Sequence, residues 1–214
     1  MKKQVSTMGR KKTPRETSES QQQLMAAALD VIAEKGIDGA TARGIADVAK
    51  VNQSLIFYYF GSVTALVIEA VSTMSARRFA VYEESLQSLD ALPDVAQKMF
   101  EVFIEDRKNC SFMVLSQFVT GAQRNKEIAA AVEKVFNPWI ALTHDTLTKV
   151  FKNADLPYEV TYDDISLALM SLFMGVQFME SIPAYEGKMG ALIEKFPAVT
   201  PLFAMLPLLM GAQK

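Results

Sequence analysis

Several residue types are scarce in this chain of 214 residues. A single cysteine, Cys110, excludes an internal disulfide and is typical of proteins kept in a reducing compartment. With only one histidine besides, His144, the sequence offers no convincing metal cluster and no Cys-His pair, and it contains neither a G-x-S-x-G elbow nor a phosphate-binding glycine loop. We therefore expect no enzyme activity, no metal and no cofactor.

Long uninterrupted apolar runs are also missing. Residues 167–179 are too few to span a membrane, and residues 196–211 are interrupted by three prolines. The start of the chain, MKKQVSTMGRKK, is polar and basic and does not resemble a signal peptide. These absences predict a cytoplasmic protein with no membrane segment.

Helix-forming residues dominate what is present. Half of the residues are hydrophobic, glycine and proline are few, and apolar residues recur every three or four positions without sustained alternation. This pattern predicts an all-α fold with a sizeable core. We expect a flexible basic arm over residues 1–19, a helix-turn-helix domain over residues 20–66 and a larger helical domain over residues 67–214.

Charge is distributed unevenly along the chain, although the net charge is only −2. Residues 1–60 hold nine lysines or arginines and six acids, whereas the remainder holds thirteen basic and eighteen acidic residues. A basic end attached to an acidic body suits a protein whose N-terminal part faces phosphates. The basic arm either follows DNA or is a tail with no ordered role, and the sequence leaves both open.

The segment TARGIADVAKVNQSLIFYYF, residues 41–60, predicts two short helices joined by a tight turn. Asn52 is a good N-cap for the second helix, which is too short to be stable alone and needs the first as a platform. A capping pattern at Ser20 predicts the start of the preceding helix, and Gly36 predicts its end. After Gly61, Ser62 is expected to cap a long linking helix. This arrangement is typical of a helix-turn-helix that enters the major groove of DNA.

The longer stretch KGIDGATARGIADVAKVNQSLIFYYF resembles the N-terminal signature of the TetR family of bacterial repressors. Gly36, Thr41, the pair Ile45-Ala46 and the aromatic run ending at Phe60 match it in spacing, over roughly residues 21–70. The resemblance implies an N-terminal three-helix DNA-binding domain followed by a helical domain that binds a ligand and dimerises. The residues it implies in DNA binding are Thr41, Arg43, Lys50, Gln53, Ser54, Leu55, Tyr58 and Tyr59.

Four positions depart from the family pattern. Lys50 stands where a glycine usually makes the turn, and Gly44 replaces a residue that is usually polar. Phe57 lacks the hydroxyl of the usual tyrosine, and Val63 lacks the charge of the usual lysine. The last two changes remove expected phosphate contacts, so the remaining residues and the basic arm must contribute more of the binding. Of Tyr58 and Tyr59, adjacent on one helix, only one is expected to face DNA.

The rest of the chain reads as successive apolar helices, with a kink or break expected near Asn137 because of Pro138. By resemblance, dimerisation would use the helices predicted over residues 162–180 and 201–210. Candidates for an effector pocket combine aromatic or methionine walls with a few polar groups. They are Phe103, Phe112, Gln117, Phe118, Trp139, His144, Met174, Gln177 and Phe178.

Together these features predict a homodimeric transcriptional regulator. Its partners would be a pseudo-palindromic operator in double-stranded DNA and a small, largely apolar effector that releases a repressor from it. Two alternatives remain open on the sequence: an all-α protein-interaction module without DNA binding, and a small-molecule enzyme. The interaction module would explain the apolar body but not the helix-turn-helix spacing.

Overall fold

The computed structural model describes residues 14–106, 111–152, 159–180, 182–185, 188, 191–192 and 195. In these residues every regular element is helical, which confirms the all-α prediction for this part of the chain. The elements are α1 (Pro14–Lys35), the 3-10 helix η1 (Ile37–Gly39), α2 (Ala42–Ala49), α3 (Ser54–Phe60), α4 (Val63–Leu86), α5 (Leu92–Asp106), α6 (Ser111–Ala122), α7 (Lys126–Val150) and α8 (Tyr162–Glu180).

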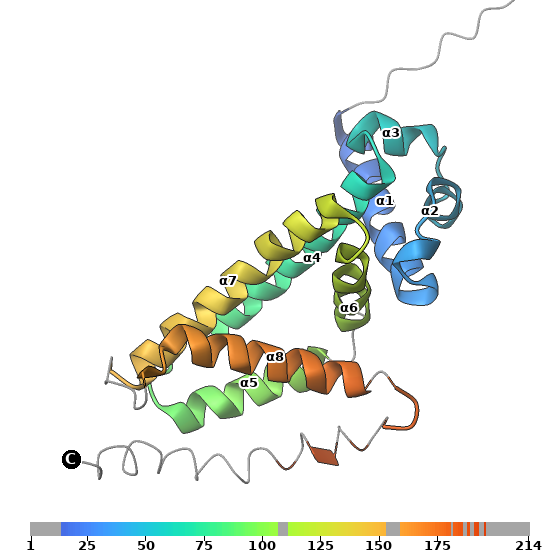
Figure 1. Ribbon diagram of the computed structural model, residues 1–214. Coiled ribbons are helices and arrows are strands. Elements are labelled where there is room, and N and C mark those ends of the chain that lie inside the picture. Colours follow the sequence, from blue (N-terminus) through green and yellow to red (C-terminus); the bar gives the residue numbers. More distant parts are fainter. Residues whose placement is uncertain are drawn as a thin grey trace, which may run out of the picture.

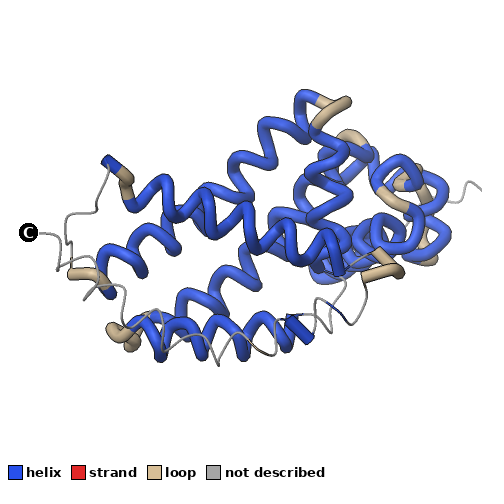
Figure 2. The backbone as a smooth tube through the Cα atoms, turned by 60° about the horizontal axis from the view of Figure 1, so that its bottom comes forward, coloured by secondary structure: helices blue, strands red, loops and turns tan. Residues whose placement is uncertain are grey.

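The helices form a small head and a larger body (Figure 1). The head contains α1, α2, α3 and the first turns of α4, and the body contains the rest of α4 with α5 to α8. Within the body α4 and α7 pack side by side, and α8 packs against α7. Figure 2 shows the same division from a second direction, with the head at one end. Because α4 runs unbroken from residue 63 to residue 86, no flexible linker separates the two parts.

The head has its own hydrophobic core. It is built from fully buried residues of α1, α2, α3 and the start of α4, in which the apolar positions recur every three or four residues. The short α3 contributes one fully buried side chain, Ile56. Its core residues are Leu24, Ala27, Ala28, Val31, Ile45, Ala46, Ile56, Leu66 and Ala70.

A second core joins the head to the body. Ile32 of α1 and Val67 of α4 pack with residues of α6 and α7 around Phe118, whose side chain is completely buried. Further contacts come from residues 36–38, the junction between α1 and α2, which meet two residues of α6 and one residue just beyond its end. The pairs are Gly36 with Gln117, Ile37 with Gly121, and Asp38 with Arg124.

Two of these pairs are close. A Cβ added to Gly121 would lie 2.7 Å from Ile37 Cδ1, so the isoleucine side chain rests directly on the α6 backbone. The Arg124 guanidinium lies 3.4 Å from the Asp38 carboxylate, but both side chains are exposed and the ion pair adds little stability. Gly36 has a φ of 72°, which confirms its expected role as the residue that ends α1.

Two expectations about helix boundaries were wrong. The first helix begins at Pro14, not at Ser20, which lies buried inside α1. Proline is favoured in a first turn, where its missing N–H is not needed, and the capping pattern at Ser20 also fits a helix interior. Residues 14–19 of the predicted arm are thus helical, and its residues 1–13 lie outside the described part.

The expected break near Asn137 is absent, since α7 is continuous through Pro138. The proline leaves the carbonyl of Lys134 without its helical donor. Both residues are on the exposed side of α7, so water can supply the missing hydrogen bond. The expected loop at Leu156-Pro157, and Cys110, lie outside the described residues.

No single helix in the described part is both long and apolar enough to cross a membrane. The pair α3 and α4 passes a test of length and composition only when taken together, and the two helices meet at a bend of 65°. Nor do the described residues hold a group of three or more His, Cys, Asp or Glu side chains placed to bind a metal ion.

Aromatic side chains fill the seam between α4 and α7. The ring of Trp139 meets the rings of Phe79 and Tyr82 edge-on, with centroids 5.6 Å and 5.1 Å away. Its indole N–H donates to the Ser75 hydroxyl at 2.9 Å. Burial raises the pKa of Tyr82 to about 12, and the positive charge of Arg78 opposes that rise only in part.

Tyr82→Phe is expected to make the protein less sensitive to alkali. An unfolded tyrosine has a pKa near 10, so the folded protein binds this proton more tightly than the unfolded chain does. Stability is therefore unaffected below about pH 10 and is lost as the pH rises toward 12, by about 2 kcal/mol in total. Urea unfolding at several alkaline pH values should show that loss in the wild type and a smaller one in the variant. Equal losses would contradict the assignment.

Candidate nucleic-acid interface

Thr41 and Gly44 fix the start of α2. The Thr41 hydroxyl oxygen accepts a hydrogen bond from the Gly44 amide at 3.1 Å, which confirms the predicted N-terminal cap. A Cβ at position 44 would lie only 3.1 Å from the same oxygen, so the unusual glycine leaves room for the cap. The hydroxyl hydrogen of Thr41 can still be donated to a phosphate, and the side chain is exposed.

The turn between α2 and α3 contains the residue that departs from the usual glycine. Lys50 has a φ of 55° and a ψ of 39°, a left-handed conformation that a residue with a Cβ adopts at some cost. The amide of Val51 donates to the carbonyl of Ala46 at 3.1 Å and closes the turn. Just before α3, the Asn52 side-chain oxygen accepts from the Ser54 amide at 2.9 Å, whereas the N-cap residue itself is Gln53, whose side chain makes no capping hydrogen bond. The altered turn was expected from the sequence, but the N-cap lies one residue later than the predicted Asn52.

Six of the eight residues predicted to bind DNA are exposed on the head. They are Thr41, Arg43, Lys50, Gln53, Ser54 and Tyr58. The other two, Leu55 and Tyr59, are half-buried and pack against the head core. As expected for neighbours on a helix, one tyrosine faces solvent and the other faces the core. The structure therefore assigns Leu55 and Tyr59 a packing role, and their contact with DNA stays a prediction.

One exposed residue of α3 was missing from the prediction. Phe57 is 53% exposed and packs against neither hydrophobic core. It shares a helical face with Ser54, which lies three residues before it. The sequence contains the signal for this exposure, because the spacing of Ile56 and Phe60 marks the buried face of α3 and leaves Phe57 outside it.

The charges on α2 lie at the edge of this surface. Arg43 Nε lies 3.8 Å from Asp47 Oδ2, and the side chains are 88% and 73% exposed. A pair this open is weak, so the guanidinium remains available to a guanine edge or a phosphate. The Asp47 carboxylate, however, opposes the approach of DNA.

Asp47→Asn is expected to strengthen DNA binding by about two- to fivefold at low salt, because it removes one repulsive charge and frees Arg43. Fluorescence anisotropy with a labelled duplex, measured over a salt series, would show the gain shrinking as salt is added. Glu69→Gln is the matched control, since Glu69 is an exposed acid on α4 beyond the α2 and α3 surface. A similar gain in both variants would point to net charge alone.

The residues predicted to bind an effector are spread over the body. Phe118 forms the centre of the junction core, while Phe112 and Gln117 are half-buried on the same helix. Gln117 lies against Gly36, where a Cβ would be 3.0 Å from its side-chain oxygen. Trp139 lies in the seam between α4 and α7. Their binding of a ligand stays a prediction.

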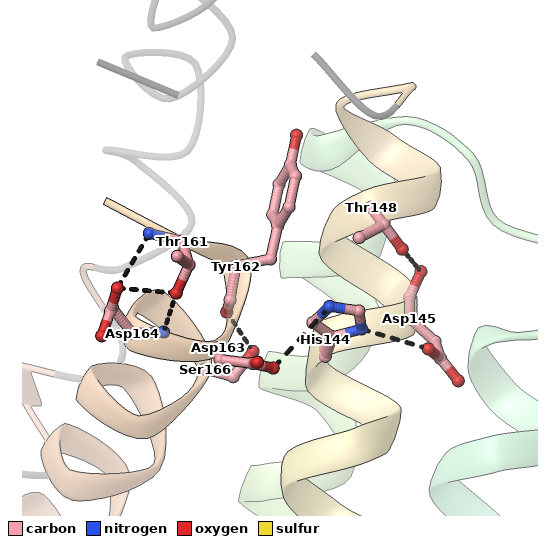
Figure 3. Close-up of polar contacts among 8 residues, drawn as sticks. All are labelled: His144, Asp145, Thr148, Thr161, Tyr162, Asp163, Asp164 and Ser166. Carbon is pink, nitrogen blue, oxygen red and sulfur yellow. Dashed lines mark hydrogen bonds and ion pairs between the residues drawn. The ribbon is translucent and has the colours of Figure 1, made fainter. Parts of the chain in front are cut away.

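His144 connects α7 to the first turn of α8 (Figure 3). Its Nε2 atom lies 3.7 Å from Asp163 Oδ1, and its Nδ1 atom lies 3.3 Å from the carboxylate of Asp145. Next to it, Thr161 and Asp164 cap α8 reciprocally, through hydrogen bonds of 2.8 Å and 3.1 Å. The Thr161 hydroxyl and amide N–H both donate to the Asp164 carboxylate and so lower the pKa of its carboxyl group. His144 thus has the surroundings of a polar link between two helices.

The remaining candidates lie on α5 and α8. Gln177 is buried, Met174 is half-buried, and Phe178 is 58% exposed. Phe103 is part of α5, and its side chain lies outside the described residues.

A cavity of about 160 Å³ opens between the head and the body. None of the nine residues predicted to bind an effector lines it. Apolar and polar side chains both line it. The lining residues are Ile37, Asp38, Ala40, Val63, Thr64, Val67, Gly121, Arg124, Asn125 and Ile128.

In the head, α1, α2 and the start of α4 support the exposed helix α3, and together they form a helix-turn-helix on an α-helical body. Residues 24–70 match the family model described as "Bacterial regulatory proteins, tetR family". The predicted resemblance to this family is confirmed for residues 24–70. No curated protein matches its sequence.

Solved structures share the fold across the whole molecule. The fatty acid degradation regulator FadR from Bacillus halodurans has a TM-score of 0.72 at 16% identity, covering 89% of this chain and 96% of that one. FadR from Bacillus subtilis, in complex with stearoyl-CoA, has a TM-score of 0.68 at 16% identity, covering 84% and 96%. The reduced form of NemR from E. coli has a TM-score of 0.67 at 18% identity, covering 84% and 94%. At these identities the likeness establishes the fold alone.

Proposed function

We propose that this regulator is a cytoplasmic homodimer that represses transcription at a pseudo-palindromic operator until a small, largely apolar ligand releases it. The observation that carries the proposal is the exposed face of α2 and α3, which presents Thr41, Arg43, Gln53, Ser54 and Tyr58 on a rigid head. In a symmetric dimer two such faces would enter successive major grooves.

The outer face of α8 supports dimerisation. Between Ile165 and Met179 this helix has no charged residue, yet Leu167, Leu172 and Phe178 are 51%, 56% and 58% exposed. A Cβ added at Gly175 would meet nothing within 4 Å, so among the described residues the helix is open at this position. An uncharged helical face of this size suits a two-fold contact with a second copy. The second helix predicted for the interface, residues 201–210, lies outside the described part.

Release by a ligand requires contacts that transmit a movement in the body to the head. The packing of Gly36 and Ile37 on α6 supplies such contacts, because a shift of α6 must move these residues or break their packing. A ligand that favours one position of α6 would then favour one spacing of the two heads. The stearoyl-CoA bound to the B. subtilis neighbour supports an effector with a large apolar part.

The central test is binding to the DNA upstream of the gene for this protein and its neighbours. Specific binding that weakens steeply as salt rises is the expected result, since cations on the head must displace counterions from phosphates. An affinity indifferent to salt, or no specific complex, would refute the proposal. Arg43→Ala should cost about 1 to 3 kcal/mol in binding if the arginine reads a base.

Ligand response can be followed through Trp139, the only tryptophan in the chain. Its ring lies between α4 and α7, so a ligand entering the body is expected to change its fluorescence. Stearoyl-CoA is a suitable first probe, with free coenzyme A as its control. Dissociation of the DNA complex in parallel with the fluorescence change would support release by a ligand, whereas fluorescence change without dissociation would argue against it.

A further inference from the structure

The DNA-reading helix of this regulator carries no charge. The sequence from Val51 to Ile68, which includes all of α3, has no Asp, Glu, Lys or Arg. Cations near this surface come from α2 and its turn, at Arg43 and Lys50. Charge therefore helps to hold the head on DNA but adds nothing to the contacts that α3 makes inside the groove.

The exposed face of α3 is aromatic. Phe57 and Tyr58 are 53% and 77% exposed, and neither belongs to a hydrophobic core. Ile56, Tyr59 and Phe60 occupy the opposite face and pack inward. Phe57 thus leaves an apolar ring in solvent beside Ser54, at the end of the head that would meet DNA.

The geometry also holds these rings in place. Tyr58 packs edge-on against Tyr59, with centroids 4.9 Å apart, and Tyr59 is itself anchored on the head core. Phe57 follows the fully buried Ile56, which fixes the rotation of the helix about its axis. An exposed ring on a rigid helix loses little conformational entropy when it meets a partner.

In the major groove the C5 methyl of thymine is the apolar group that an apolar side chain can recognise. A phenylalanine has no donor or acceptor for the other base edges or for phosphates. We propose that Phe57 selects thymine by packing its ring against this methyl group, once in each half-site of the operator. This inference rests on the proposed entry of α3 into the groove.

The test removes a single methyl group. Duplexes are first selected from a random library with the full-length protein, and each thymine of the selected site is then replaced by deoxyuridine. The replacement keeps base pairing and deletes only the methyl. Replacing one thymine in a single half-site should weaken wild-type binding about fourfold, and replacing the equivalent thymine in both half-sites should weaken it about fifteenfold.

The Phe57→Ala variant makes the test specific. In this variant the effect of deoxyuridine at that thymine should vanish, because the methyl has lost its partner. Tyr58→Phe is the matched control: it keeps a ring at the neighbouring position and should show the full deoxyuridine effect. Because Phe57 is exposed and outside both cores, the melting temperature of Phe57→Ala should stay close to that of the wild type.

The outcomes separate the role of Phe57 from operator binding by the protein. A selected duplex whose affinity does not depend on any thymine methyl overturns the role of Phe57 and leaves operator binding intact. A methyl effect that persists in Phe57→Ala assigns the reading to another residue and overturns the role equally. Failure to select any duplex overturns the proposed function, and the role of Phe57 with it.

Discussion

Replacing Leu172 with glutamate is expected to turn the protein into a monomer and to abolish tight operator binding. Leu172 lies at the middle of the uncharged outer face of α8 and is 56% exposed. In a two-fold interface the substitution occurs twice, and each carboxylate would be buried without a partner. We expect the dimer dissociation constant to rise by at least about 100-fold. Analytical ultracentrifugation at micromolar concentration would measure it.

Ala130→Glu provides the control for this experiment. Ala130 is an exposed residue of α7, away from α8, so the same charge is added without touching the proposed interface. This variant should remain dimeric and should bind DNA with slightly reduced affinity. A Leu172→Glu protein that stays dimeric would exclude α8 from the interface, and a monomeric wild type would overturn the dimer itself.

Phe118→Ala is expected to lower the free energy of unfolding by about 3 to 5 kcal/mol. The ring is completely buried among residues from α1, α4, α6 and α7, so its removal leaves a cavity that these helices cannot easily close. The loss should also loosen the head from the body and weaken DNA binding beyond the loss in folded protein. Urea unfolding, followed by circular dichroism, measures the first effect, and DNA titration at low temperature measures the second.

Met113→Ala is the matched substitution on the same helix. Its side chain is 37% exposed, and we expect it to cost less than about 1 kcal/mol. A similarly small cost at Phe118 would favour the alternative role predicted from the sequence, in which the ring lines a ligand cavity with space on one side. The size of the destabilisation therefore distinguishes a core residue from a pocket wall.

The head could be predicted in detail because its signals are local. Gly36, Thr41, Asn52 and Ser62 each act on backbone groups two to four residues away, so the sequence contains both partners of each interaction. Two local signals, at Ser20 and Pro138, nevertheless led to wrong predictions of a helix start and a helix break. The Ser20 pattern fits a helix interior as well as a helix start, and the cost of Pro138 depends on whether its face is exposed.

The candidate effector residues rest on a weaker signal than the residues of the head. Periodicity shows which side of a helix is buried, but it does not show which helix covers that side. Phe118 was predicted as a pocket wall, and the structure encloses its ring among residues of α1, α4, α6 and α7, whereas Phe178, predicted on the same pattern, is 58% exposed. The exposure of Phe57 was not predicted, because it follows from the burial of Ile56 and Tyr59 around the head core.

The packing of residues 36–38 on α6 limits how this head could be exchanged with that of another regulator. Ile37 fits because position 121 has no Cβ, so a recipient body with alanine or a larger residue there would clash with it unless the side chain turned away. A working hybrid would have to carry α1 to the start of α4 together with a compatible stretch of α6, although these segments are far apart in the sequence. The transferable unit is thus larger than the helix-turn-helix and discontinuous along the chain.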